Sequence, residues 1–436
     1  MTPEPSAWGV LPFLGILLSI ALLPMAAPRF WHRHYPAVAA AWGLAFALPF
    51  LWRFRGAGAQ QLLEVALGEY VPFLVMLWGL FTVTGGIEIA GSLAGTPRNN
   101  LVLLLSGTAL ASCVGTTGAS MLLLRPLLRA NAGRKHRAHL VVFFIFLVSN
   151  VGGSLTPLGD PPLFLGFLLG VPFFWTVRLL PDTLLIVGLM GAVFYGIDAG
   201  AWRREGTPPP PSSGGRLRLA GGRNLVLLGG IVASVWLSGV WHAGEVDLLG
   251  VHRRVEGVLR DGVILLLGLV SLAVTPAELR RRNGFGWGPM REVAILFAAI
   301  FTTMVGPLLM LRAGEGFRLQ TPDHLYWVTG LLSSVLDNAP TYLTMVHAQL
   351  GRFFPGVEIG EAVARLVRER PEYLHAVSAG AVFMGALTYV GNAPNFMVKA
   401  IAEEAGVAMP SFFGYILRWS LPILGPALLL VAWLFI

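Results

Sequence analysis

Two carboxylic acids, Asp160 and Asp337, stand in polar interruptions of otherwise apolar segments. Asp160 closes the stretch 149–160, which is rich in glycine and hydroxyl residues, and Asp337 opens the stretch 337–341. A carboxylate beside unpaired backbone carbonyls offers oxygen ligands for Na⁺, and the same group can carry a proton. We therefore interpret both acids as candidate Na⁺ and H⁺ sites. The alternative is that each acid only caps a half-helix, because Asp is a good N-cap.

Neutral polar side chains near the interruptions could complete such a site. Amide and hydroxyl oxygens are suitable neutral ligands, although polar residues at helix crossings often serve only to join helices. Besides the two acids, the candidate ion-binding or substrate-binding residues are Asn150, Thr156, Asn338, Thr341, Asn392, Asn395, Thr116 and Thr117, with Ser154 as a further neutral ligand.

Four other charged residues lie within or near predicted spans. Glu88 follows Gly85-Gly86-Ile87 and is either an accessory site residue or the structural partner of an arginine or an amide. Lys399 follows the interruption at 391–395; it could neutralise an acid, bind an anionic substrate, or extend to the cytoplasmic interface. Asp182 and Asp198 lie near predicted span ends, where structural roles are expected.

The composition indicates a membrane protein. Of 436 residues, 55% are hydrophobic and only 12% are charged, whereas soluble domains carry about 25% charged residues. The net charge of +8 does not indicate nucleic-acid binding, because arginines collect in the cytoplasmic loops of membrane proteins. The single cysteine, Cys113, excludes an intramolecular disulfide. The sequence has no phosphate-binding Gly-x-x-x-x-Gly-Lys-Ser/Thr motif. We expect neither an enzyme nor a cofactor.

The apolar runs predict an all-α polytopic fold with about ten or eleven spans, since a helix needs about 20 apolar residues to cross the bilayer core. The interrupted segments 101–130 and 324–350 are predicted to form re-entrant hairpins. The segments 139–171 and 374–404 are predicted to be broken transmembrane helices. Simple spans are expected near 8–27, 36–53, 70–92, 176–199, 224–242, 261–276, 291–312 and 411–436.

These elements occur twice in the same order, which is typical of repeat transporters. The first copy covers residues 70–199 and the second covers 291–436. In this comparison, Asp337 is the counterpart of Asp160, and Asn392 is the counterpart of Asn150. The other predicted parts are N-terminal scaffold spans (1–69), a cytoplasmic linker (200–223) and further scaffold spans (224–290).

The arginine distribution predicts an inverted repeat. The loops at 28–35, 129–138, 200–223 and 277–291 hold many arginines, so the positive-inside rule makes this face cytoplasmic. The first hairpin then opens to the cytoplasm and the second to the outside. Arginines at 351–373 fall on the outer face and count against this topology, although glutamates in the same stretch partly offset them.

The two interruptions resemble a known family. Residues 149–160 look like the Ser-Asn-x-Gly-Gly-x-x-Thr-Pro-x-Gly-Asp signature of NhaD-type sodium/proton antiporters, and residues 333–340 resemble their Ser-Ser-x-x-Asp-Asn-x-Pro motif. This resemblance to the ion transporter superfamily implies an elevator-type fold with a scaffold domain and a transport domain, and usually a dimer. It marks as site positions Asn150, Thr156, Asp160, Asp337 and Asn338.

A third region departs from the NhaD pattern. Residues 388–399 resemble instead the related CitMHS-like branch, which is labelled as citrate transporters. The dicarboxylate carriers of the superfamily use paired Ser-Asn-Thr motifs. This chain has Ser149-Asn150-Val151 in the first place and Gly391-Asn392-Ala393 in the second, which argues against the same mode of carboxylate binding.

These patterns predict a multi-pass secondary active transporter of the inner membrane. The leading hypothesis is a sodium/proton antiporter that exchanges Na⁺ for H⁺ at buried carboxylates by an elevator-type mechanism. The alternative is a citrate, dicarboxylate or other small-anion transporter of the same superfamily. The expected partners are the lipid bilayer, the small transported ion, and a second copy of the chain. The stretches 150–160 and 337–341 should then lie within about 10 Å of each other, the width of one helix.

Overall fold

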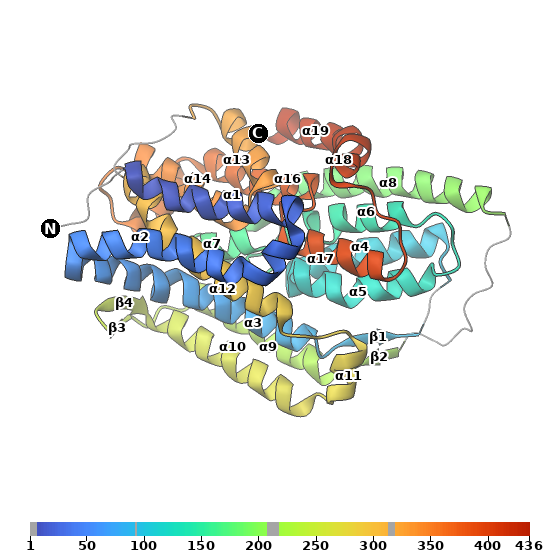
Figure 1. The fold of residues 1–436 in the computed structure, drawn as a ribbon, viewed down its shortest axis with the longest axis horizontal. Coiled ribbons are helices and arrows are strands. Elements are labelled where there is room, and N and C mark those ends of the chain that lie inside the picture. Colours follow the sequence, from blue (N-terminus) through green and yellow to red (C-terminus); the bar gives the residue numbers. More distant parts are fainter. Residues whose placement is uncertain (1–6, 92–93, 207–217, 313–318) are drawn as a thin grey trace.

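The computed structural model describes residues 7–91, 94–206, 218–312 and 319–436. Most of these residues are helical, and many of the helices lie roughly along the long axis of the molecule (Figure 1). Six helices are long and apolar enough to cross a membrane, which confirms the all-α polytopic prediction. Strands in the described residues are confined to two short antiparallel pairs, β1 with β2 and β3 with β4.

The first half of the chain contains one long series of helices and one strand. In order, its elements are η1 (Ala7–Gly9), α1 (Val10–Ala26), α2 (Pro28–Val65), the π-helical η2 (Ala66–Tyr70), α3 (Val71–Thr84), β1 (Glu88–Ala90), α4 (Pro97–Val114), α5 (Thr116–Ala130), α6 (Ala138–Leu147), η3 (Val151–Gly153), α7 (Pro161–Leu169), η4 (Phe173–Leu179) and α8 (Leu180–Arg204).

The second half begins with the strand that pairs with β1. Its elements are β2 (Arg218–Ala220), α9 (Arg223–Val240), β3 (Glu245–Leu248), β4 (Val251–Arg254), α10 (Val255–Val274), α11 (Ala277–Arg282), α12 (Gly288–Arg312), α13 (Pro322–Val335), α14 (Asn338–Phe353), α15 (Ile359–Glu369), α16 (Pro371–Met384), η5 (Gly385–Leu387), α17 (Ala393–Glu404), α18 (Phe412–Tyr415), the π-helical η6 (Ile416–Leu424) and α19 (Gly425–Phe435).

The predicted span boundaries agree with the structure in part. The span expected at 36–53 lies within α2, which begins at Pro28, a residue that suits the first turn because the N–H it lacks would have no helical partner there. Its predicted end lies beside a kink at Arg55, whose backbone is not helical (φ 45°, ψ −122°). The span expected at 70–92 ends at Thr84. The chain then turns at Gly85 and Gly86 and continues as β1, whose Glu88 pairs with Ala220. The predicted linker 200–223 therefore contains the end of α8 and the strand β2, while its residues 207–217 lie outside the described part.

Two helical hairpins occupy the segments predicted to be interrupted. Helices α4 and α5 meet at Gly115, whose φ of 81° is a conformation that glycine adopts at little cost. Helices α13 and α14 meet at Leu336 and Asp337, which have extended backbones. Each hairpin therefore has a short turn that places the first residue of its second helix at the tip.

Two helices are broken where the sequence becomes polar. Helix α6 ends at Leu147 and α7 begins after Asp160, and α16 ends at Met384 and α17 begins after Asn392. Bilayer hydrocarbon offers no partners to irregular backbone, so such breaks must be buried in protein. The residues Asn150, Asp160 and Asn392 in these breaks are at most 1% exposed, so both breaks are buried within the protein.

Candidate functional site

The N-termini of four helices converge on the carboxylate of Asp160, which itself precedes α7. Thr116, the first residue of α5, donates its hydroxyl to Oδ1 of Asp160 at 3.2 Å. Asn338, the first residue of α14, donates Nδ2 to Oδ2 at 2.7 Å. Asn392, which precedes α17, donates Nδ2 to Oδ1 at 3.0 Å. The expected proximity of the two polar interruptions is thus confirmed.

The Asp160 carboxylate has no cationic partner among the described residues. It is 1% exposed, and the side chains that bond to it, from Thr116, Asn338 and Asn392, are all neutral. Helix N-termini carry partial positive charge that favours an anion. Burial of an isolated carboxylate is nevertheless costly unless a proton or a cation neutralises it. The arrangement therefore suits a group that alternates between these two ligands.

One oxygen beside Asp160 is left for a ligand. Oδ1 of Asn338 is buried and has no hydrogen-bond partner in the described part of the chain. Buried polar atoms are nearly always paired, so an unpaired amide oxygen next to a carboxylate is a candidate cation ligand. Asn338 would then donate a hydrogen bond to Asp160 through Nδ2 and bind the ion through Oδ1.

The second predicted acid, Asp337, acts first as a helix cap. Its carboxylate accepts the backbone N–H of Ala339 at 3.0 Å, and the residue is only half-buried. It is the adjacent Asn338 that reaches Asp160. The capping interpretation of Asp337 thus has direct structural support, and a role in ion binding stays a prediction.

Three asparagines join the two broken helices beside Asp160. Asn150 donates Nδ2 to Oδ1 of Asn395 at 2.8 Å, and Asn392 donates Nδ2 to Oδ1 of Asn150 at 3.3 Å. Asn395 in turn donates to the carbonyl oxygens of Gly385 and Thr388. This network of amides places Asn392 between Asn150 and Asp160.

The two breaks share one local geometry. Thr156 donates its hydroxyl to the carbonyl of Ser112 in the first hairpin, and Thr388 donates to the carbonyl of Ser334 in the second. Each threonine oxygen also accepts the N–H two residues later. Thr156 and Thr388 therefore each link a helix break to the tip of the hairpin in the same repeat by a hydrogen bond. The Thr156 hydroxyl does not bond to Asp160.

The predicted pairing of the repeats was wrong. Four residues after Thr156 comes Asp160, before α7, and four residues after Thr388 comes Asn392, before α17. Asp160 and Asn392 are thus the equivalent residues. Asp337 precedes α14 as Gly115 precedes α5. The sequence comparison matched one acid with another, whereas in the structure the equivalent residues are those that precede corresponding helices.

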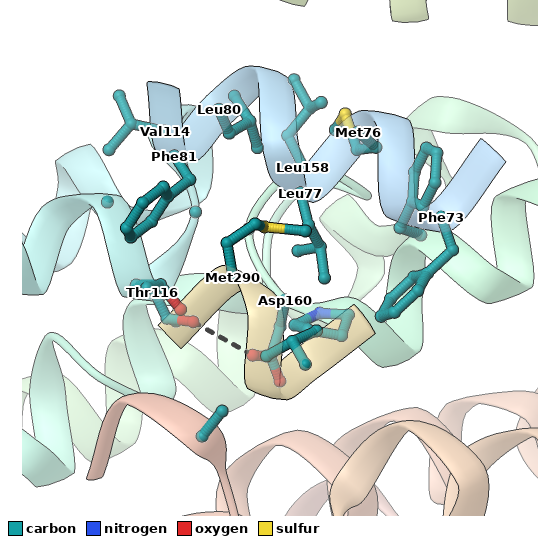
Figure 2. Close-up of a pocket in the computed structure, with 18 of the residues that line it drawn as sticks. Phe73, Met76, Leu77, Leu80, Phe81, Val114, Thr116, Leu158, Asp160 and Met290 are labelled. Carbon is teal, nitrogen blue, oxygen red and sulfur yellow. Dashed lines mark hydrogen bonds between the residues drawn. The ribbon is translucent and has the colours of Figure 1, made fainter. Parts of the chain in front are cut away.

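An apolar cavity of about 110 Å³ opens above Asp160 (Figure 2). Phe73, Leu77 and Leu80 of α3 line one wall, Met290 of α12 contributes to the lining, and Thr117 lies among the lining residues of the hairpin tip. No lysine, arginine or histidine is among the described lining residues. The space exceeds that of one water molecule, which needs about 10–15 Å³ on this measure. Sequence reasoning missed the α3 and α12 contributions, because apolar residues in an apolar span carry no local signal.

Several predicted residues lie away from Asp160. Glu88 is on β1, and its Oε2 lies 3.4 Å from Nε of Arg282. This contact agrees with the alternative expectation that Glu88 is the structural partner of an arginine. Lys399 binds Glu403 at 2.7 Å. The hydroxyl of Thr341 donates to the carbonyl of Asp337 within its own helix. These contacts do not place Glu88, Lys399 or Thr341 at the carboxylate.

The two other acids singled out in the sequence, Asp182 and Asp198, are buried and have partners of their own. Asp198 lies 2.5 Å from Nη1 of Arg134 and 2.9 Å from Nε2 of His139. Asp182 lies 3.0 Å from Nε2 of His375. The predicted structural roles of Asp182 and Asp198 agree with these contacts, and among the described residues neither an arginine nor a histidine pairs with the Asp160 carboxylate.

Comparison with known proteins agrees with the membrane architecture. Residues 2–436 match the profile of the CitMHS_2 family, which is described as "Putative citrate transport". The chain belongs to this family. It is also similar to a "46 kDa membrane protein" of Mycobacterium leprae (strain TN), with 25% identity over 335 residues that cover 72% of this chain and 71% of the relative. Family membership and the apolar helices identify the protein as a multi-pass membrane transporter.

Proposed function

We propose that this family member is a secondary active sodium/proton antiporter of the inner membrane, with Asp160 as the group that carries either ion. The observation that supports this most directly is a fully buried carboxylate whose described partners are all neutral donors. Such a group needs a positive ligand, and both H⁺ and Na⁺ can supply the charge.

In the proton-loaded form, Asp160 is a neutral acid among Thr116, Asn338 and Asn392. In the sodium-loaded form, its carboxylate and Oδ1 of Asn338 bind the cation, with Asp337 close by at the same hairpin tip. Only one of the two ions occupies the carboxylate at a time, so binding of Na⁺ requires release of H⁺. This competition couples outward movement of Na⁺ to inward movement of H⁺.

An elevator movement would carry the site across the membrane. The proposed transport domain consists of the two hairpins and the two broken helices, which Asp160 and the asparagines tie together. The wall that α3 presents to this unit is made of Phe73, Met76, Leu77 and Leu80. An apolar wall of this kind offers no hydrogen bonds that sliding would break. The scaffold spans would form the contact of a homodimer.

A citrate or other small-anion transporter is the second candidate. The family description favours it, and four converging helix N-termini can hold a carboxylate ligand. The Asp160 charge and the absence of a basic side chain among the described cavity residues disfavour it. In this case the cation at Asp160 would drive the anion instead of being the cargo.

Flux through proteoliposomes separates the two functions. An imposed Na⁺ gradient should drive proton movement with wild-type protein and with Asp323→Asn, an exposed acid at the start of α13. Asp160→Asn should abolish it. Uptake of labelled citrate by wild-type protein, without any Na⁺-driven proton flux, would instead establish the anion transporter and contradict the antiporter.

A further inference from the structure

A second cavity, of about 590 Å³, lies where α6 begins and α8 ends. One wall is the α8 stretch Gly196–Ala201, and another is formed by Gly406–Ala408 and Trp419. Basic residues dominate the polar part of the lining. They are Lys135, His136, Arg137, His139 and Arg204. We call this space the basic cavity; none of its lining residues belongs to the Asp160 site.

The acids near the basic cavity already have partners. Asp198 binds Arg134 and His139. Glu205 accepts Nε of Arg134 at 3.1 Å and the backbone N–H of His136 at 2.9 Å. These contacts pair both acids with Arg134, His136 or His139, so they do not neutralise the other cations that line the basic cavity.

The cations at the rim of the basic cavity are Lys135, Arg137 and Arg204, of which Lys135 and Arg204 are exposed. Arg137 donates to the carbonyl oxygen of Gly406 at 2.9 Å. Within the described residues, no carboxylate forms an ion pair with Lys135, Arg137 or Arg204. Helix α6, ten residues long, begins at Ala138 in the cavity lining and adds the partial positive charge of its N-terminus.

The α8 wall keeps the space open. Gly196 and Gly200 both line the cavity, and a Cβ placed on either glycine would meet no heavy atom within 4 Å. Trp419 is amphipathic and typical of the membrane–water interface. The arginine-rich loops at 129–138 and 200–223 are those predicted to be cytoplasmic, which is the side where anionic lipids attract basic segments.

We propose that the basic cavity binds a phosphate group. Lysine, arginine and a helix N-terminus are the groups that recognise phosphate in proteins. Two sources of this chemistry exist, the headgroup of an anionic phospholipid and free phosphate. The volume accommodates either one. This site is separate from ion transport at Asp160 and does not depend on the function proposed above.

The test compares binding to the purified full-length protein in detergent. Native mass spectrometry measures retention of phosphatidylglycerol and, as a zwitterionic reference, phosphatidylcholine; calorimetric titration measures binding of inorganic phosphate. The charge variant is Lys135→Gln/Arg137→Gln/Arg204→Gln. Its matched control is Arg33→Gln/Arg223→Gln/Arg291→Gln, which removes the same charge from exposed residues of loops expected on the same face. A third variant, Gly196→Leu/Gly200→Leu, fills the cavity without changing charge.

We expect the charge variant to bind the phosphate ligand at least about tenfold more weakly, since each basic residue near an anionic group contributes measurably. The filled variant should lose binding as well, and the control should stay within about twofold of wild type. Phosphatidylglycerol retention that resists inorganic phosphate identifies the lipid as the source, and displacement by phosphate identifies the free anion.

Equal binding by wild-type, charge-variant and filled proteins would overturn the proposal, as would failure of wild-type protein to bind either ligand. An equal loss in the control would also overturn it, because the effect would then reflect net charge. If the charge variant does not give a monodisperse protein, the filled variant decides the question.

Discussion

The contact between Asn338 and Asp160 provides the most specific prediction for the ion site. Nδ2 of Asn338 lies 2.7 Å from Oδ2 of Asp160 and is the one side-chain donor to that oxygen among the described residues. The other two donors, from Thr116 and Asn392, share Oδ1. Asn338→Ala would therefore leave Oδ2 without a partner and also remove the unpaired Oδ1 of Asn338.

The magnitude follows from the charge on the acceptor. A hydrogen bond to a charged group contributes about 1.5–3 kcal/mol, and each 1.4 kcal/mol corresponds to about tenfold in affinity. We expect Asn338→Ala to raise the apparent KM for Na⁺ by about 10- to 150-fold. Asn392→Ala, with a longer bond to a shared oxygen, should have a smaller effect.

The assay is Na⁺-driven proton flux in proteoliposomes at a series of Na⁺ concentrations. Thr341→Val is the matched control, because the Thr341 hydroxyl is bonded within its own helix; it should leave the KM within about twofold, since its bond does not reach the ion. The reasoning is refuted if Asn338→Ala keeps the wild-type KM while the protein remains folded, or if Thr341→Val has the larger effect.

Three further predictions concern the framework around the site. A Cβ on Gly159 would lie 2.2 Å from the carbonyl oxygen of Gly153, whereas Gly188 has open space. Gly159→Ala should therefore lower the free energy of unfolding by about 1–3 kcal/mol and with it the thermal unfolding midpoint. Gly188→Ala should leave the midpoint unchanged. Equal midpoints for the two variants would count against the close packing at Gly159. Thr156→Val and Thr388→Val each remove the hydroxyl that donates from a helix break to the carbonyl of its hairpin, so they should reduce Na⁺-driven proton flux by similar factors. A difference above about tenfold, or roughly 1.4 kcal/mol, would show that the two hydrogen bonds are not equivalent. Asp198→Asn leaves the buried Arg134 with Glu205 as its one remaining carboxylate partner among the described residues. It should lower the free energy of unfolding by about 1.5–3 kcal/mol, the contribution of a hydrogen bond to a charged group, and reduce the yield of monodisperse protein in size-exclusion chromatography. Lys399→Gln should elute normally, and the reverse order would contradict this assignment.

The broad architecture could be predicted because the bilayer restricts the chain. A spanning helix must be apolar over its length, so spans and polar breaks are visible in the composition alone. The ends of spans were less predictable. Helix α2 kinks at Arg55, whose φ is 45°, and helical structure resumes up to Val65. Gly85 and Gly86, by contrast, end the helical run after α3.

The site could be predicted only in part. Asp160 and its asparagines were recognisable, because polar residues inside an apolar segment need partners. The choice between Asp337 and Asn338 depended on helix phase, since the N-cap residue turns back to its own backbone and the next residue faces the site. The match of Asp160 with Asn392 had a signal in the sequence, the shared Thr-x-x-Gly before each residue, which a comparison of acids overlooked.

The apolar wall was beyond sequence reasoning. Phe73 and Met290 come from spans that are far apart in the chain, and both line the Asp160 cavity. Their side chains resemble those of any buried span. Only the packing of α3 and α12 beside the hairpin tip makes them part of the site.

The most direct test of the central claim is proton release on sodium binding. Na⁺ is added to purified protein in weakly buffered detergent solution, and the pH change gives the protons released per chain. Competition for Asp160 predicts release of about one proton per bound Na⁺, as expected for a single shared carboxyl, from wild-type protein and from Asp323→Asn, and none from Asp160→Asn. Sodium binding without proton release, or equal release from Asp160→Asn, would contradict the account.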